Sequence, residues 1–332
     1  MHIMTNKRIM FFIKGIILTI IFYYLITNNR LNIFKFAFLF RNPQQLILLV
    51  LLIAIGFTSL STFRWWLLLR ALHLNVPLLR TYFISWIGGL LSTVVPGTMG
   101  GDIVKGTYIF NALEDAGKAK ILATLLVDRF VGVFGLTVLA ITNIMWNFSL
   151  VMSQTKVQTI AIIIICLFII MTLFLTVIVI PINEVHDPFL FLINKLPGKS
   201  IMAKCYKAIK LYQFKKKVLL LTVLISIMIQ VLLIYIFWQL TQLILIPKVS
   251  IYSLFFIIPV GTITTIVPLA PGGIGVGHIA FEYLYNLFGV RGGADIFNSY
   301  IILQIGVNTM GGIPYMIYPL FWKKPDQNDG KP

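Results

Sequence analysis

Long runs of apolar residues constrain this chain more than any other feature. Hydrophobic residues make up 59% of the sequence and charged residues only 11%, whereas roughly 25% of the residues in soluble proteins are charged. A helix needs about 20 predominantly apolar residues to cross a bilayer, so 332 residues allow about six to eight crossings with short loops. The sequence therefore predicts an all-α integral membrane protein, with one polytopic membrane domain at 1–322 and a short polar tail at 323–332.

Six continuous apolar runs are long enough to be full crossings. They occupy residues 9–26, 46–69, 119–146, 157–180, 218–246 and 294–321. The first run follows two basic residues, but it is longer than the core of a signal peptide and no small-residue cleavage site follows it. We therefore expect it to be retained as the first span.

The distribution of the basic residues indicates how the chain is oriented. The formal net charge is +17, and the loop at 181–217 holds eight lysines but only Glu184 and Asp187 as acidic residues, whereas residues 144–156 carry a single charge. An excess of lysine marks cytoplasmic loops and attracts anionic lipids. We therefore expect a cell inner (cytoplasmic) membrane location, both termini in the cytoplasm, and contact with anionic lipids at that face rather than with nucleic acid.

Two further apolar segments, 78–110 and 251–289, are interrupted by proline and glycine. The helix expected after the first interruption, at 103–113, would be about 16 Å long, too short for a hydrocarbon core of about 30 Å. We therefore expect two re-entrant hairpins, with two short crossings in each segment as the alternative.

The two interruptions resemble each other in sequence. The tetrapeptide Thr-Val-Val-Pro at 93–96 recurs as Thr-Ile-Val-Pro at 265–268, and a glycine-rich turn follows each copy. In the expected topology the two hairpins enter from opposite faces, which is the inverted-repeat arrangement of many transporters. The alternative is that so short a match arises by chance in an apolar chain.

Interrupted helices at membrane depth indicate a polar cavity, because backbone N–H and C=O groups must be satisfied there by protein or water. The candidate binding residues lie in and after the two turns. They are Pro96, Gly97, Gly100, Gly101, Asp102 and Lys105 at the first, and Pro271, Gly272, Gly273 and Gly275 at the second. The helix N-terminus and the lysine suit a phosphate group. Alternatively, the glycines only let helices pack closely.

Acidic residues at membrane depth are a second indication of a site. Asp128 lies close to the expected midplane, where a charge costs about 2.5 to 3.5 kcal/mol. Adjacent residues of a helix point apart, so Asp128 cannot pair with its neighbour Arg129 along the helix. An ion pair must instead form across helices, with Arg64, Lys105 or Arg129 as the basic partner. The alternative is a structural ion network without a ligand.

His278 and Glu282 are four residues apart and share one helix face. This pair predicts either a proton relay or only a local hydrogen bond. Asp102 and Asp295 are the other acidic residues at or near membrane depth.

Familiar enzyme motifs do not occur in this sequence. Gly-x-Ser-x-Gly and His-Glu-x-x-His are missing, and the Gly-Lys-Ser at 198–200 lacks the first glycine of a phosphate-binding loop because Ile193 takes its place. We therefore expect no catalytic residue, no metal and no cofactor, and a protein that is not an enzyme.

Three sequence blocks carry a resemblance to a known family. Residues 96–105 read PGTMGGDIVK, 127–132 read VDRFVG and 271–276 read PGGIGV. In this order the blocks resemble the lysylphosphatidylglycerol synthase transmembrane-region family, which comprises flippase-like proteins. Two departures are Lys105, where an arginine is common, and His278, where many relatives have a glutamate. The resemblance implies a stand-alone member without the soluble aminoacyl-transferase domain.

These features together predict a lipid translocator. The headgroup of a phospholipid or of a polyprenyl-linked lipid would cross through a hydrated groove while its chains stay in the bilayer. Two alternatives are a membrane-embedded glycosyl- or phosphotransferase acting on a polyprenyl phosphate, and an ion-coupled transporter of a small solute. A cavity that opens sideways to lipid would distinguish the translocator from the solute transporter.

Overall fold

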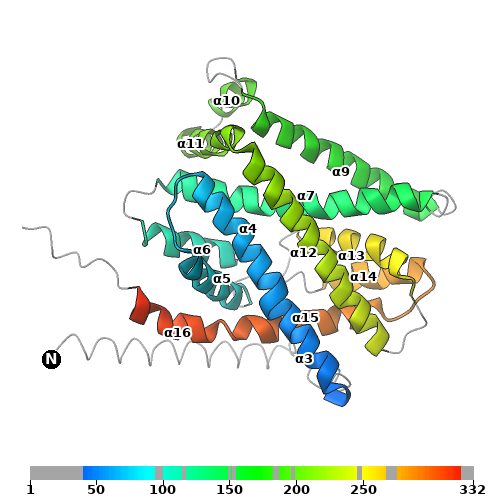
Figure 1. Cartoon of the computed structure of the whole chain (residues 1–332). Coiled ribbons are helices and arrows are strands. Elements are labelled where there is room, and N and C mark those ends of the chain that lie inside the picture. The colour runs from blue at the N-terminus through cyan, green and yellow to red at the C-terminus, as the bar shows by residue number, and fades with distance from the viewer. Residues whose placement is uncertain are drawn as a thin grey trace, which may run out of the picture.

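The regular structure of the described residues is entirely helical, which confirms the predicted fold class (Figure 1). The computed structural model describes residues 40–93, 100–113, 117–148, 151, 155–181, 187–195, 199–244, 249–266 and 275–322. The expected first span at 9–26 and the polar tail at 323–332 lie outside these ranges, as do most of the two interruptions.

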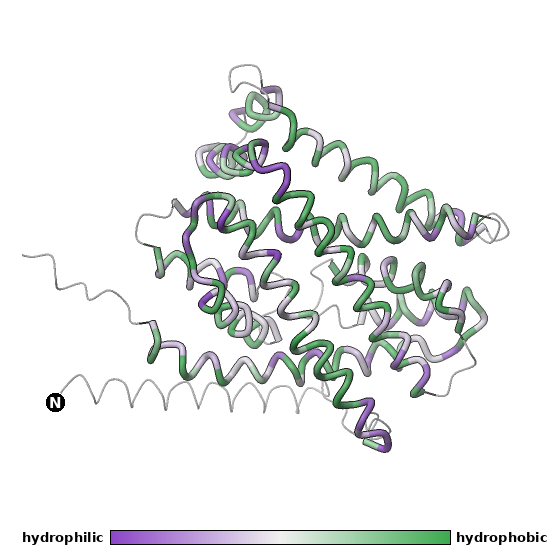
Figure 2. The backbone as a smooth tube through the Cα atoms, viewed as in Figure 1, coloured by the Kyte–Doolittle hydropathy of each residue, from purple (hydrophilic) through white to green (hydrophobic). Residues whose placement is uncertain are grey.

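Four helices in the described ranges are long and apolar enough to cross a membrane. They are the continuous helix Pro43–Ala71, α7 (Lys118–Trp146), α9 (Thr155–Val179) and α12 (Lys216–Leu243). Each coincides with a predicted span to within a few residues. Pro43–Ala71 comprises α3 (Pro43–Leu51), the π-helical turn η2 (Leu52–Phe57) and α4 (Thr58–Ala71). Figure 2 shows the apolar character of α9 and α12 along most of their lengths.

The predicted span at 294–321 is not one continuous helix. It divides into α15 (Gly293–Thr309) and α16 (Gly312–Phe321). A side chain at Gly311 would collide with the carbonyl oxygen of Trp86, so the backbone at the break lies directly against the first interrupted segment, 78–110. Pro314 then falls in the first turn of α16, where a missing N–H is tolerated. The apolar run alone did not reveal this break.

The two interrupted segments form two pairs of short helices. The first pair is α5 (Leu78–Ser92) with α6 (Gly100–Phe110), and the second is α13 (Ile251–Thr265) with α14 (Val276–Leu287). The members of each pair pack against each other. The longest of them has 15 residues, which is about 22 Å and too short to cross the core alone.

Equivalent contacts relate the two pairs. Gly88 is the eleventh residue of α5 and Gly261 the eleventh of α13. A Cβ at Gly88 would lie 2.8 Å from Cγ of Lys105, and one at Gly261 would lie 2.6 Å from Cε2 of Phe281. Lys105 and Phe281 are each the sixth residue of their helix. This contact of the first pair therefore recurs in the second, with an aromatic ring in place of the lysine. The glycine at the second position of each short helix differs, because Gly101 meets Gly88 within its pair whereas Gly277 meets Phe297 on the following helix.

The helices around the pairs repeat in the same order but in opposite directions. In each unit a long helix precedes the pair, and a further helical segment follows it: α4 and α7 in the first, α12 and α15–α16 in the second. The two leading helices, α4 and α12, pack together and run antiparallel, and α7 runs opposite to α15–α16 (Figure 1). Equivalent helices that run in opposite directions describe an inverted repeat.

The basic loop between the two units is folded. It contains α10 (Pro188–Ile193), α11 (Lys199–Lys210) and the 3-10 turn η4 (Leu211–Phe214). Asp187 caps α10 by accepting from two backbone N–H groups, and it also accepts from the Tyr206 hydroxyl at 2.9 Å. Burial and this hydrogen bond raise the pKa of Tyr206. Lys210 donates to the carbonyl oxygen of Val177 in the last turn of α9 and to that of Ile180, one residue past the helix, so the loop is fixed to the bundle.

Candidate functional site

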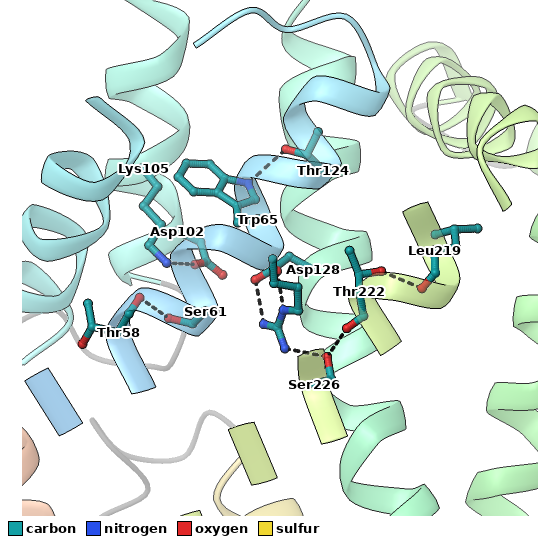
Figure 3. Close-up of polar contacts among 11 residues, drawn as sticks. Thr58, Ser61, Trp65, Asp102, Lys105, Thr124, Asp128, Leu219, Thr222 and Ser226 are labelled. Carbon is teal, nitrogen blue, oxygen red and sulfur yellow. Dashed lines mark hydrogen bonds and ion pairs between the residues drawn. The ribbon is translucent and has the colours of Figure 1, made fainter. Parts of the chain in front are cut away.

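A largely buried ion pair joins two long helices, and a hydroxyl group links it to a third. Arg64 on α4 donates from Nε to Oδ1 of Asp128 on α7 at 2.8 Å and from Nη2 to Oδ2 at 3.0 Å. Its third nitrogen, Nη1, donates to Oγ of Ser226 on α12 at 2.8 Å. Figure 3 shows Asp128 and Ser226 converging on this guanidinium. The expectation that Asp128 pairs across helices is correct, and its partner is Arg64.

A second cluster of charges lies at the start of α6. The carboxylate of Asp102 accepts a hydrogen bond from Nε of Arg129 on α7, and Nζ of Lys105 lies 3.8 Å from its other oxygen. The Lys105 ammonium also lies 5.5 Å from the centre of the Trp65 ring, a cation–π contact. Among the described side chains, two cations thus surround one carboxylate, and the sum of these three charges is positive.

Two glycines bring the helices of the first pair into backbone contact. A Cβ at Gly101 would lie 2.6 Å from the carbonyl oxygen of Gly88, so any side chain at Gly101 would push α5 and α6 apart. Close helix packing therefore accounts for a glycine at position 101, which was the alternative to a binding role for the glycines. Gly101 also lines the cavity next to it, and its neighbour Gly100 is buried.

A polar cavity of about 200 Å³ lies between α4, α5, α6 and α15. The charged side chains in its wall are Asp102 and Lys105. The remaining polar side chains are uncharged: the hydroxyls of Thr58, Ser61, Ser85 and Ser92 and the amides of Gln304 and Asn308. At about 30 Å³ for each water, this volume holds roughly six or seven waters. The cavity therefore suits a group the size of a lipid headgroup.

An apolar groove of about 460 Å³ runs between α6 and α7, and Asp102 belongs to its wall as well as to the wall of the cavity. Arg129 lies at the same end of the groove, and Lys118 contributes to its wall farther along. Most of the other lining residues are apolar, and Ile103, Leu122 and Leu126 are exposed on the outside of the molecule. The groove thus gives the polar cavity an apolar neighbour that is open at the surface of the molecule.

The candidates after the second interruption act as helix caps. Gly275 precedes α14 with a φ of 91°, a conformation that favours glycine. Nδ1 of His278 accepts from the backbone N–H of Gly275 at 3.2 Å. Glu282 accepts from the backbone N–H groups of Ala294 at 3.0 Å and Gly292 at 3.4 Å, at the start of α15. Both side chains thus bond to backbone groups at the starts of helices, and the proton relay between them stays a prediction.

The structure thus brings only some of the predicted residues together. Gly101, Asp102 and Lys105 line the cavity, with Arg129 beside them. Arg64 and Asp128 form their own pair, and neither is in the lining of the cavity or the groove. Five predicted residues lie outside the described ranges: Pro96, Gly97, Pro271, Gly272 and Gly273.

Sequence reasoning missed the residues that α4 and α15 contribute. Gln304 and Asn308 are polar, four apart and within an apolar run, which was a usable signal. Thr58 follows the π-helical turn, and its Oγ1 donates to the carbonyl oxygen of Ile53, five residues earlier, at 3.0 Å. Such π-helical turns are frequent at functional sites.

The fold and this site define an integral membrane protein with a polar cavity between interrupted helices. Residues 11–295 match the family model of the lysylphosphatidylglycerol synthase transmembrane region. The chain belongs to this family. Comparisons with curated proteins and with solved structures found no match.

Proposed function

We propose that this protein translocates lipids. The polar headgroup occupies the cavity between α4, α5, α6 and α15, and the acyl or prenyl chains lie in the groove between α6 and α7. The observation that carries the proposal is that the cavity and the groove share Asp102 in their walls, so a polar site and an apolar site for one amphipathic molecule lie side by side. Membership of a lipid-related family supports it.

The phosphate of the lipid binds beside Lys105. Its ammonium lines the cavity, and Arg129 lies next to it through their shared partner Asp102. The site has a net positive charge and a partly buried setting in which hydrogen bonds to a phosphate are strong. We propose transport rather than chemistry, because the carboxylates that a transferase would need, Asp102 and Asp128, are each held by an arginine.

The proposal is tested in liposomes that contain the purified protein and a fluorescent phospholipid in both leaflets. A membrane-impermeant quencher is added from outside, without ATP. With the protein we expect fluorescence from both leaflets to be lost, because inner lipids reach the outside. Without the protein only the outer leaflet should be quenched. If liposomes with and without protein behave alike for phospholipids and for polyprenyl-linked sugars, the protein is not a translocator of these lipids.

We further propose that the folded loop of α10 and α11 lies at the cytoplasmic face of the cytoplasmic membrane, together with both termini. The loop exposes the apolar side chains Phe191 and Ile201 beside the exposed lysines Lys204 and Lys207, a combination that binds anionic lipid surfaces. In a variant with Cys166 and Cys205 replaced by alanine, a cysteine at Lys204 should react with an impermeant reagent only after cells are opened. A cysteine at Trp146, at the opposite end of α7, should react in intact cells, and the reverse pattern would contradict this orientation.

A further inference from the structure

Ser85 on α5 is a buried hydroxyl that needs a partner. The residue is 8% exposed, it lines the polar cavity, and among the described residues its Oγ makes no hydrogen bond. A buried polar group without a partner is costly and is normally completed by water or a ligand. In this structure the Oγ has almost no accessible surface, so the Ser85 side chain must rotate toward the cavity for a ligand there to reach the hydroxyl.

Other groups in the wall present hydrogen-bond acceptors to the cavity. The Ser61 hydroxyl donates to the carbonyl oxygen of Thr58 at 3.0 Å, and the Ser92 hydroxyl donates to that of Gly89 at 2.6 Å. Each hydroxyl oxygen then keeps lone pairs that can accept. Gln304 and Asn308 add amides that both donate and accept. A ligand with several hydroxyl groups satisfies such a wall.

The charges around the cavity select against a cationic headgroup. Asp102 is the only carboxylate in the described lining, and Arg129 and Lys105 already neutralise it. Asp128 is paired with Arg64, and Glu282 caps α15. An ammonium group in the cavity would therefore meet Lys105 and find no free carboxylate among these residues.

From these observations we infer that the cavity binds an anionic, hydroxyl-rich headgroup, a glycerol phosphate or a sugar phosphate, in preference to a cationic aminoacylated one. This inference rests on the proposed function and specifies its substrate class. The phosphate lies beside Lys105, and the hydroxyl groups reach Ser85, Gln304 and Asn308. Such a headgroup belongs either to a phosphoglycerol lipid or to a polyprenyl-linked sugar.

The test compares headgroups in the liposome assay, with lipids that carry the same dye. Three are used: phosphatidylglycerol, its lysyl ester and a polyprenyl phosphate sugar. We expect the initial rate for phosphatidylglycerol or for the sugar lipid to exceed that for the lysyl ester at least about tenfold, because like charges are strongly disfavoured in a shared site. The faster of the two identifies the source of the headgroup.

Two cavity variants show whether the hydroxyl groups are recognised here. Ser85→Ala and Gln304→Leu should each slow the preferred lipid about two- to tenfold, the effect of one lost hydrogen bond, and slow the lysyl ester less than the preferred lipid. Thr142→Val, at an exposed hydroxyl on α7, is the matched control and should change neither rate.

The outcomes separate this inference from the proposed function. A lysyl ester that moves as fast as phosphatidylglycerol and the sugar lipid, or faster, would overturn the inference and leave translocation standing. Cavity variants that slow all lipids equally would also overturn it, because the hydroxyl groups would then not be recognised. If no lipid moves faster than in protein-free liposomes, the proposed function fails and the inference fails with it.

Discussion

Replacing Asp128 with asparagine should lower the free energy of unfolding by about 3 to 5 kcal/mol, the usual cost of removing one partner of a buried ion pair. The Arg64 and Asp128 side chains are only 9% and 16% exposed, and both carboxylate oxygens accept hydrogen bonds from the guanidinium. The variant leaves that charge buried without its counter-ion. Unfolding of the purified protein in detergent micelles, followed by circular dichroism against denaturant, measures the loss.

A double variant separates the ion pair from the rest of the packing. With Arg64 and Asp128 both replaced by leucine, we expect most of the stability to return, because apolar residues of similar volume often replace a buried pair without loss. Ser226 keeps a hydrogen bond in this variant, since its hydroxyl donates to the carbonyl oxygen of Thr222 at 2.9 Å. An Asp128→Asn protein as stable as the wild type would show that the pair does not hold α4, α7 and α12 together.

The sequence was sufficient for most of the fold because the length and apolarity of a crossing depend on the bilayer and not on tertiary contacts. The helices at 43–71, 118–146, 155–179 and 216–243 therefore lie close to their predicted bounds. The break between α15 and α16 coincides with the Gly-Gly-Ile-Pro at 311–314, a local signal that was overlooked within the apolar run. The close approach of Gly311 to Trp86 joins residues far apart in the chain and could not be predicted from it.

The candidate site was only partly predictable. Asp102 and Lys105 follow a Pro-Gly interruption, a local pattern that singled them out. Three basic residues could have paired with Asp128, and only the packing of α4 against α7 selects Arg64. Gln304 and Asn308 line the cavity from the second unit of the repeat. No local pattern in the first unit therefore predicts that they contribute to the site.

The two units of the repeat differ in charge at one equivalent position. The position of Lys105 in the first pair corresponds to that of Phe281 in the second, and Phe281 stacks on Phe237 and Phe297. The first unit therefore keeps a charged site where the second has an aromatic core. A short tetrapeptide match in the sequence could indicate the repeat but not this difference between its halves.

Replacing Lys105 with methionine should slow lipid translocation at least about tenfold, since hydrogen bonds to charged groups contribute about 1.5 to 3 kcal/mol. Methionine keeps an unbranched side chain to pack against Gly88, where Cγ of Lys105 makes the closest approach, so the helix pair should stay intact. Lys105→Arg should retain translocation because it keeps the charge. The initial rate of quencher access to inner-leaflet lipid measures the effect.

The central claim is that the headgroup passes beside Lys105. Its most direct test is the initial rate of quencher access to inner-leaflet lipid, measured for Lys105→Met and Lys120→Met at equal protein density. Lys120 is exposed on α7 and lies outside both the cavity and the groove, so it controls for the loss of a lysine. We predict that Lys105→Met falls at least about tenfold below the wild type, while Lys120→Met matches the wild type. Equal rates for the wild type and both variants would show that lipid does not cross through this cavity.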